Sequence, residues 1–350
     1  MASGRFLGRA GTELRVPVGV RDLRAFQDAL VGWFRRDGAD HPWRRTTDPY
    51  AILVSEMMLQ QTRVTTVLDR GYYDRWMRRF PDAATLAAAS EAEVLRAWEG
   101  LGYYTRARNL LRAARTVVAS HGGVFPRTVA ALEALPGIGR YTAAAVASFA
   151  FNQPVPLVDG NVARVLARVA EFRGEVDKPA GHRFLWGLAA TLVPARRARH
   201  FNSALMELGQ RVCVPRAPRC GACPVARWCR AKDHRPDLLP ARSPRRATVE
   251  VDEHAILAVG KRGVLLHRES GRRRHGLWKL PARDRREVAG RPVLLDTRYT
   301  ITHHKVRLRV YAQKATPAPR PGEEWIALAD LPALPMPAPY RRAVRELLRG

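Results

Sequence analysis

The sequence is short of long apolar runs, of cysteine and of lysine, and each shortage narrows what the chain can be. No stretch reaches the roughly 18 consecutive apolar residues of a transmembrane helix, and residues 1–9 lack the apolar segment of a secretory signal. We therefore expect an intracellular, cytoplasmic protein that is not secreted and has no membrane partner. Of its 350 residues, 46% are hydrophobic and 26% are charged, which is the composition of a globular chain with room for two domains.

Acidic residues are also scarce relative to basic ones. The chain has 32 Asp and Glu against 60 Lys and Arg, a formal net charge of +28. Such a field attracts polyanions, and nucleic acid is the first candidate. Only 6 of the 60 basic residues are Lys, so part of the arginine excess can instead reflect a GC-rich genome. Nucleic-acid binding is the better-supported of these two interpretations.

The 4 cysteines all fall within 17 residues, at Cys213, Cys220, Cys223 and Cys229. A secreted disulfide framework would usually spread its cysteines over a smaller chain. Four thiolates in one compact run can ligate either a [4Fe-4S] cluster or a structural zinc ion. Zinc sites more often use two tight Cys-x-x-Cys pairs, whereas this run has one, so the spacing favours the cluster.

The hydrophobic periodicity changes along the chain and predicts two domains. Apolar residues recur at helical spacing over residues 21–37 and again from residue 49 to about residue 212. The second stretch contains no convincing β-hairpin. Later, Val306, Leu308 and Val310 alternate with arginines, as in a half-exposed strand. We expect a basic, disordered extension, a helical domain, a proline-containing linker and a smaller α+β domain, over residues 1–20, 21–233, 234–250 and 251–350. The segments expected to be helical include 21–37, 91–98, 106–119, 128–134, 141–150, 161–170, 183–193 and 340–349, and a strand–turn–strand is expected over 255–268.

A Leu-Pro-Gly-Ile-Gly-Arg segment at residues 135–140 joins two of the expected helices. Glycines at 137 and 139 allow a tight turn and a close approach of the backbone to a ligand. The amides at the start of the following helix can then hold a phosphate. The segment predicts a helix-hairpin-helix over about residues 128–150, with Gly137, Gly139 and Arg140 against DNA. A purely structural turn between packed helices is the alternative.

Two carboxylates stand at positions that suit catalysis. Glu56 lies within an almost wholly apolar helical segment, where burial tends to raise the pKa of a carboxyl group and suits it to act as a general acid. Asp159 immediately precedes a helix, about 20 residues after the hairpin. The bland alternatives are a Glu56 paired with an arginine and an Asp159 that only caps its helix.

Together these segments resemble the helix-hairpin-helix DNA glycosylases that carry an iron–sulfur cluster. The cysteine spacing, the hairpin and the Val-Asp-Gly-Asn-Val segment at 158–162 are shared with that superfamily, and the resemblance runs from about Trp33 to Cys229. It implies a mainly α helix-hairpin-helix glycosylase core with a [4Fe-4S] loop at 213–229. The smaller domain resembles, more loosely, the MutT-like (Nudix-fold) domain of the MutY adenine glycosylases, without the glutamate-rich hydrolase motif.

Within the superfamily, the sequence resembles the MutY adenine glycosylases more than endonuclease III. Endonuclease III carries a lysine directly after the Leu-Pro-Gly-x-Gly-Arg motif, and this amine forms a Schiff base with the sugar. Here the position holds Tyr141, whose phenol cannot form an imine. The Val-Ser-Glu-Met-Met-Leu-Gln-Gln-Thr segment at 54–62 and the Gly-Leu-Gly-Tyr-Tyr segment at 100–104 are also similar to the MutY family.

The resemblance implies a monofunctional glycosylase that removes adenine paired with 8-oxoguanine or guanine in double-stranded DNA. It makes Glu56 the general acid and Asp159 the anion that stabilises the sugar cation or captures it covalently. Tyr141 and Asn161 would position Asp159 and the water. The family's Phe-Ser-His loop, which senses 8-oxoguanine, corresponds to Ile301-Thr302-His303, so the hydroxyl is kept and the aromatic is lost. The residues expected to contact DNA are Gln61, Tyr103, Gly137, Gly139, Arg140, Thr302 and His303.

Two other interpretations remain open at this point. One is an endonuclease III-like glycosylase and abasic-site lyase that acts on oxidised pyrimidines. The other is a DNA-damage-binding protein without catalysis, against which the presence of both carboxylates argues. In every case we expect a monomer associated with the nucleoid.

Overall fold

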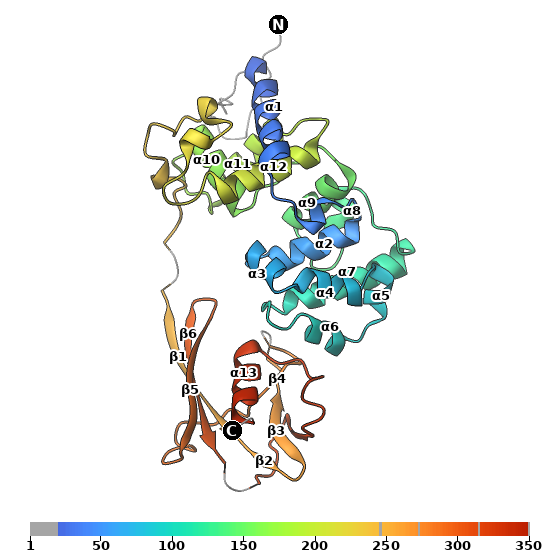
Figure 1. The fold of residues 1–350 in the computed structure, drawn as a ribbon, viewed down its shortest axis with the longest axis vertical. Coiled ribbons are helices and arrows are strands. Elements are labelled where there is room, and N and C mark those ends of the chain that lie inside the picture. Colours follow the sequence, from blue (N-terminus) through green and yellow to red (C-terminus); the bar gives the residue numbers. More distant parts are fainter. Residues whose placement is uncertain (1–19, 245–246, 272–273, 314–315, 349–350) are drawn as a thin grey trace. The chain divides into compact units, whose positions relative to one another are not determined.

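The computed structural model describes most of the chain (Figure 1). The described residues are 20–244, 247–271, 274–313 and 316–348. By internal contacts the chain divides into two compact units, one of residues 1–56 and 125–244 and the other of residues 57–124 and 245–350. The expected extension lies outside the described residues except for its last residue, Val20, and so do residues 245–246 of the expected linker.

The first unit is helical. It contains α1 (Val20–Asp37), most of α2 (Pro49–Leu59), α8 (Val129–Glu133), α9 (Arg140–Phe151), α10 (Gly160–Ala170), α11 (Pro179–Leu192) and α12 (Ala198–Arg211). Short 3-10 helices lie at Pro42–Arg44, Cys220–Ala222, Ala226–Trp228 and Pro236–Leu238.

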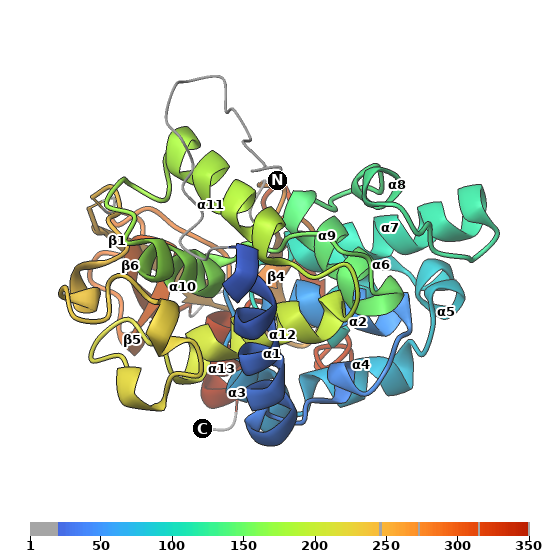
Figure 2. The same ribbon diagram turned by 90° about the horizontal axis from the view of Figure 1, so that it is seen from above.

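One apolar core holds this unit together. Phe26 and Leu30 of α1 meet Phe201 and Leu205 of α12, and the apolar stripe of α10 joins the same core through Leu166. The views in Figures 1 and 2 both place α1 against α12. Burying five such side chains stabilises the fold by about 1.5–3 kcal/mol each before the loss of chain entropy is counted. The core therefore fixes the N-terminal end of α10, where Asp159 lies.

The second unit begins with five helices. They are α3 (Val64–Asp69), α4 (Tyr72–Arg79), α5 (Ala83–Ala88), α6 (Glu91–Ala97) and α7 (Thr105–His121). Ser90 and Glu93 form a reciprocal capping box at the start of α6, which satisfies backbone amides that the helix itself leaves unpaired. At the other end of α6, Trp98 is fully buried and its ring meets Trp76 edge-on at 5.2 Å. These contacts fix the loop that follows α6, residues 99–104.

The rest of the second unit is a small α+β domain with two sheets. Its elements are β1 (Val249–Leu257), β2 (Val259–Gly260), β3 (Gly263–Arg268), β4 (Trp278–Lys279), β5 (Val293–Ile301), β6 (His304–Ala312), β7 (Glu323–Ile326) and α13 (Ala338–Leu347). One sheet has the order β1-β6-β5, and the other joins β2, β3 and β4, with β7 also paired to β3. Strands of both sheets contribute to one core with Tyr340 and Val344 of α13, which lies between the sheets in Figure 1.

The expected order of a helical domain before an α+β domain is confirmed, with helix ends within four residues of the predicted ones. The expected strand–turn–strand over 255–268 is wrong in part. Most of the first expected strand belongs to β1, which pairs in parallel with β6. Val259 and Gly260 form the short strand β2, which pairs with β3. The chain passes from one sheet to the other at Ala258, because the residues on either side of it bury against different strands. No helix among the described residues is long and apolar enough to cross a membrane.

Candidate active site

Glu56 is a buried carboxyl group in an apolar helix. It lies in α2, and its side chain is 5% exposed. Burial raises the pKa of Glu56 to about 7, the nearby Asp159 charge also raises it, and a hydrogen bond from Tyr141 and the charge of Arg44 oppose the shift. A carboxyl group with this pKa can hold a proton at neutral pH and release it within the pH range of the cell. Both the expected burial and the expected direction of the shift are found.

The alternative interpretation of Glu56 is a carboxylate paired with an arginine. Arg44 is the arginine whose charge acts on Glu56, but its ion pair is with Glu207. Its guanidinium donates to Glu207 at 2.7 Å and to the carbonyl oxygen of Ala39 at 2.7 Å. Glu207 is 1% exposed and also accepts from Arg211 at 3.2 Å. The charge of Arg44 therefore acts on Glu56 without an ion pair between them, and Glu56 can be protonated.

Tyr141 lies close to both carboxylates. It is the second residue of α9, and its hydroxyl is within hydrogen-bonding reach of Glu56 and lies 3.8 Å from Met206 Sδ. Burial raises the pKa of Tyr141 well above its ordinary value, and the charges of Glu56 and Asp159 raise it further. The phenol is therefore a neutral hydrogen-bond donor at neutral pH, which suits it to hold a carboxylate in place.

Asp159 caps α10 and at the same time faces the other two groups. Its Oδ1 accepts from the backbone amides of Asn161 at 2.9 Å and Val162 at 2.7 Å, and its Oδ2 accepts from Asn161 Nδ2 at 3.1 Å. The carboxylate thus lies at the start of the helix, and these three hydrogen bonds fix the orientation of both of its oxygen atoms.

A chain of hydrogen bonds runs from this carboxylate toward the cysteine segment. Arg164 donates to Asn161 Oδ1 at 2.9 Å, and its Nε donates to the carbonyl oxygen of Cys213 at 2.8 Å. Arg164 is 7% exposed, and its guanidinium also donates to the carbonyl oxygen of Gly209 at 2.6 Å. Gly209 has no room for a side chain, because a Cβ there would lie 2.8 Å from that of Asn161. The position of Asp159 is therefore coupled to the start of the cysteine segment.

The hairpin has the geometry that the sequence predicts. Thr128 caps α8 by accepting from Ala131, and α9 starts after a turn in which Gly137 has φ +76°. Gly139 is the N-cap of α9 and has no side chain to satisfy the helix amides. It is exposed with φ −95°, and no described atom lies within 4 Å of a Cβ built there. The guanidinium of exposed Arg140 stacks 3.9 Å from the ring centre of Trp186.

The four cysteines line one small cavity in the first unit. All four are free thiols, and Cys213, Cys220, Cys223 and Cys229 share the cavity wall with Arg168. Arg168 is 1% exposed, and it donates to Cys213 Sγ at 3.3 Å and to the carbonyl oxygens of Val214 and Pro215. Among the described residues, no three His, Cys, Asp or Glu side chains are arranged to hold a single metal ion.

Gln61 and Tyr103 lie in the second unit, on two loops joined by a buried arginine. Arg106 is 6% exposed, and it donates to the carbonyl oxygens of Gln60 at 2.5 Å, Leu101 at 3.0 Å and Gly102 at 3.1 Å. Both predicted DNA contacts are exposed with left-handed backbones, at φ 57° for Gln61 and φ 48° for Tyr103. The Arg106 guanidinium also lies 5.4 Å from the centre of the Tyr103 ring.

Thr302 and His303 form the two-residue turn of the hairpin between β5 and β6. Ile301 pairs with His304 on either side of the turn, and Thr302 has φ +55°. The Thr302 hydroxyl lies 3.3 Å from Nδ1 of His304. The turn therefore presents the hydroxyl and the imidazole that the sequence predicts at the tip of a hairpin.

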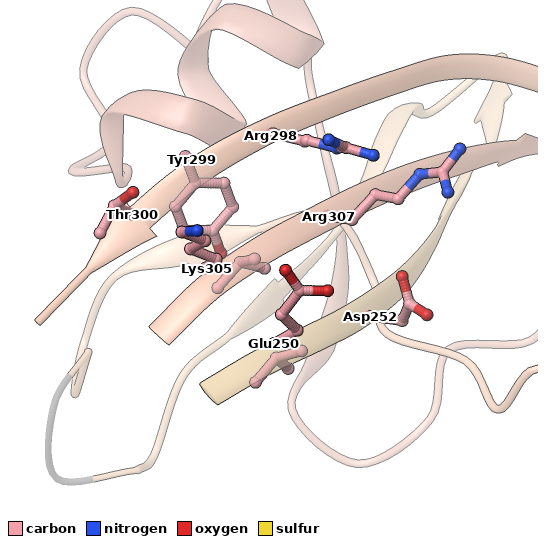
Figure 3. A pocket seen from close by; sticks show the side chains of 9 residues that line it. Glu250, Asp252, Arg298, Tyr299, Thr300, Lys305 and Arg307 are labelled. Atoms are coloured by element: carbon pink, nitrogen blue, oxygen red, sulfur yellow. The ribbon is translucent and has the colours of Figure 1, made fainter. Parts of the chain in front are cut away.

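A polar cavity of about 410 Å³ lies on the sheet face below this turn. Figure 3 shows that its side chains come from β1, β5 and β6. Arg298, Lys305 and Arg307 supply positive charge, and Glu250 and Asp252 supply negative charge. With both signs present, the cavity by itself does not point to one ligand.

Sequence reasoning missed four arginines that organise the site, the half-buried Arg44 and the buried Arg106, Arg164 and Arg168. Arg164 and Arg168 could have been suspected, because they interrupt the apolar stripe of α10 at helical spacing. The partners of Arg44 and Arg106 are mostly side chains or carbonyl groups far away in the sequence, so no local pattern marks them.

A family model matches part of the chain. The model for the HhH-GPD superfamily of base excision DNA repair proteins matches residues 54–186. That range contains Glu56, Tyr103, the hairpin and Asp159.

Curated proteins similar to this chain are adenine DNA glycosylases. The human one is 47% identical over 222 residues, which is 61% of this chain and 40% of the human protein. The Mycolicibacterium smegmatis one is 48% identical over 202 residues, which is 57% of this chain and 68% of that protein. The matched part therefore spans about two fifths of the mammalian relatives and about two thirds of the mycobacterial one.

Solved structures match the helical part of the chain. A thermostable thymine-DNA glycosylase has a TM-score of 0.55 and is 32% identical, over 61% of this chain and 97% of that one. An endonuclease III bound non-covalently to DNA has a TM-score of 0.52 at 23% identity, over 62% of this chain and 98% of that one, and shows a shared fold.

Proposed function

Because this chain belongs to the adenine DNA glycosylase family of the HhH-GPD superfamily of base excision DNA repair proteins, we propose that it hydrolyses the N-glycosidic bond of adenine mispaired in DNA. The observation that carries the proposal is a buried, protonatable Glu56 close to a helix-capping Asp159, with Tyr141 beside both. An acid and an anion in one site are what cleavage of a base from its sugar requires.

The bond is cleaved in two stages. Glu56 gives its proton to N7 of adenine, and the electron pair of the C1′–N9 bond leaves with the base. The sugar becomes an oxocarbenium ion, which the Asp159 anion stabilises. Water then adds to C1′ and loses a proton to the ionised Glu56, which leaves free adenine, an abasic site and a regenerated acid. Throughout the reaction, Asn161 orients Asp159 and Tyr141 orients Glu56.

The reaction is proposed to stop at the abasic site. A lyase step needs an amine that forms an imine with the opened sugar. Tyr141 stands where endonuclease III has its lysine, and a phenol with a raised pKa is neither an amine nor a strong nucleophile. This residue distinguishes the proposal from the bifunctional alternative for oxidised pyrimidines.

Double-stranded DNA is proposed to be held by the hairpin and opened by the two exposed loops. The α9 amides behind Gly137 and Gly139 would bind a backbone phosphate, with Arg140 beside them. Tyr103 and Gln61 would enter the duplex beside the extruded adenine, and a mispair lowers the cost of that extrusion. The net charge of +28 supports DNA binding, and the protein is proposed to act as a cytoplasmic, nucleoid-bound monomer.

The opposing base is proposed to be 8-oxoguanine or guanine, read by Thr302 and His303. The turn of the β5–β6 hairpin presents a hydroxyl and an imidazole, which can hydrogen-bond to the edge of a base. The α+β domain is proposed to have the MutT-like fold with this reading role and without hydrolase activity.

The four cysteines are proposed to hold a [4Fe-4S] cluster. A tetrahedral zinc ion draws its four sulfurs close together, whereas a four-iron cluster keeps its thiolates farther apart around a larger core. Four free thiols line one cavity and can reach one bound group, and the single Cys-x-x-Cys pair in the run favours the cluster. When bound, the cluster would order the segment of residues 213–229 and its arginines. Elemental analysis of the purified protein should find about four iron atoms per chain and little zinc.

The proposed activity is tested by single-turnover base release from duplexes with one central A:8-oxoguanine, A:G or A:T pair, or one thymine glycol. We expect adenine release from the first two and strand breakage only after alkali. Release of thymine glycol with direct nicking would favour the lyase alternative. Tight binding with no release from any duplex would leave a damage-binding protein.

A further inference from the structure

The loop that carries Tyr103 is anchored by the α+β domain within the second unit. We call residues 99–104 the wedge loop. At its start, Glu99 forms a bidentate ion pair with Arg341 of α13. Arg341 Nε donates to Glu99 Oε1 at 2.9 Å and Arg341 Nη2 donates to Glu99 Oε2 at 3.0 Å. The Arg341 and Glu99 side chains are only 7% and 11% exposed. A buried pair with this geometry is directional and strongly held.

The end of the wedge loop is anchored as well. Tyr104 is 6% exposed, and its hydroxyl donates to the carbonyl oxygen of Met336 at 3.1 Å. Met336 is fully buried in the core of the α+β domain, just before α13. Arg341 holds the same segment in place, because it also donates to the carbonyl oxygens of Leu331, at 2.6 Å, and Leu334. One arginine therefore organises both anchors.

The backbone between the anchors is in a conformation that needs support. Gly100 and Gly102 have φ +97° and +68°, and Tyr103 has φ +48°. Gly100 also packs tightly, because a Cβ there would lie 2.0 Å from the Tyr72 hydroxyl. A left-handed backbone is unfavourable at a residue with a large side chain and persists only where the surrounding structure imposes it. The two anchors and the hydrogen bonds from Arg106 hold the loop in this conformation.

Tyr103 itself is the part of the loop that is free to meet a ligand. It is 44% exposed, while Leu101 and Tyr104 on either side are buried. The anchors thus hold the flanks of an exposed aromatic side chain and leave its ring accessible.

We propose that Arg341 is a positioning residue for Tyr103, so that the α+β domain tightens DNA binding through the wedge loop as well as through its own hairpin turn. The inference rests on the proposed function, which places Tyr103 in the duplex. It predicts that a change at Arg341, in a different domain from Tyr103, acts on DNA through Tyr103.

The test is a double-mutant cycle on DNA affinity in the full-length protein. The probe is a fluorescein-labelled duplex with a tetrahydrofuran abasic analogue opposite guanine, read by anisotropy. We expect Arg341→Gln to weaken binding about fivefold, and to cause almost no further loss in a protein that already carries Tyr103→Ala, since coupled residues are not additive. The charge-matched control is Arg342→Gln, an exposed position of the same helix, which should change binding less than about twofold.

Glu99→Gln provides a second route to the same result if Arg341→Gln does not fold. The amide can still accept a hydrogen bond from Arg341 but has lost the charge, so a smaller loss is expected, again only when Tyr103 is present. Thermal unfolding of every variant separates a folded protein from an unfolded one.

Equal losses with and without the Tyr103→Ala substitution would overturn the inference, and so would an Arg341→Gln affinity equal to that of Arg342→Gln. Failure of the proposed function would look different. It would be an absence of adenine release by the wild-type protein, while the cycle is measured by binding alone on a duplex that contains no base to remove at that site.

Discussion

At the scale of single residues, the site is defined by two carboxylates that the fold treats in opposite ways. Glu56 is placed among apolar side chains, which penalise its charge, and Asp159 is placed at a helix start, where it accepts hydrogen bonds from two backbone amides. The acid and the anion are therefore assigned by environment rather than by residue type. Each assignment leads to a measurable consequence.

The burial of Glu56 should make it destabilising at neutral and alkaline pH. The unfolded chain releases this proton near the ordinary pKa of 4.5, whereas the folded protein keeps it to about 7. Between these values the folded state binds more protons, so stability falls as pH rises and stays low above the window. Glu56→Gln should thus raise the free energy of unfolding by about 3 kcal/mol at about pH 8.

Urea unfolding at about pH 8 and about pH 5 measures this difference, which should be small at the lower pH. The same variant should slow adenine release by about 10²–10⁴-fold. A variant that is both inactive and less stable at about pH 8 would contradict the burial argument.

Asp159→Asn should separate the cap from the charge. Asparagine caps helices about as well as aspartate, so the unfolding free energy should change by less than about 1 kcal/mol. Adenine release should fall by about 10²–10³-fold because the sugar cation loses its anion. The matched control is Asp82→Asn, the cap of α5, which accepts from Thr85 and should leave release unchanged. Equal activity of the two variants would remove Asp159 from the mechanism.

At the scale of elements, the start of α9 shows a glycine that the fold does not need. Gly137 has φ +76°, so its glycine is explained by the turn. Gly139 has φ −95° and open space where a side chain would be, so neither strain nor packing explains its glycine. Glycine is acceptable at this N-cap position, and it also leaves room for a ligand to come close to the backbone.

Gly139→Ala should therefore fold normally and bind DNA poorly. The unfolding free energy should fall by no more than about 1 kcal/mol, because the position is unstrained but alanine is a poorer N-cap than glycine. Affinity for any duplex should fall about tenfold or more, because a hydrogen bond to a charged phosphate contributes about 1.5–3 kcal/mol. Anisotropy titrations measure this, with Gly187→Ala in the middle of α11 as the control. Unchanged affinity would move the phosphate site elsewhere.

At the scale of the whole molecule, charge governs the encounter with DNA. The net charge of +28 is carried almost entirely by arginine. Some arginines are buried and structural, such as Arg168 and Arg341, so they contribute to the field without being available to phosphate. The exposed remainder sets the salt dependence.

Binding to an undamaged duplex should weaken about a thousandfold between about 50 mM and about 200 mM salt, as for a protein with six or more phosphate contacts. Anisotropy titrations at several salt concentrations give the slope of affinity against salt. Thermal unfolding at each salt concentration provides the control for stability. A change of less than about tenfold would mean that most of the positive charge lies away from the DNA.

The sequence by itself determined the features that depend on neighbours along the chain. Helical periodicity, the glycines at 137 and 139, the cap at Asp159 and the spacing of the cysteines are all local patterns, and the structure confirms the helices, the hairpin and the cap. The apolar surroundings of Glu56 were also legible, because they belong to its own helix.

Only the tertiary structure decided the features that depend on distant partners. The roles of Arg44, Arg106 and Arg341 come from carboxylates and carbonyl groups on other elements, and an exposed arginine and a buried one look alike in sequence. The parallel pairing of β1 with β6 could not be predicted either. The alternation of apolar and polar residues identifies a strand but does not show which strand it pairs with. The physical reason is common to all of them, because burial and long-range pairing are set by the path of the whole chain.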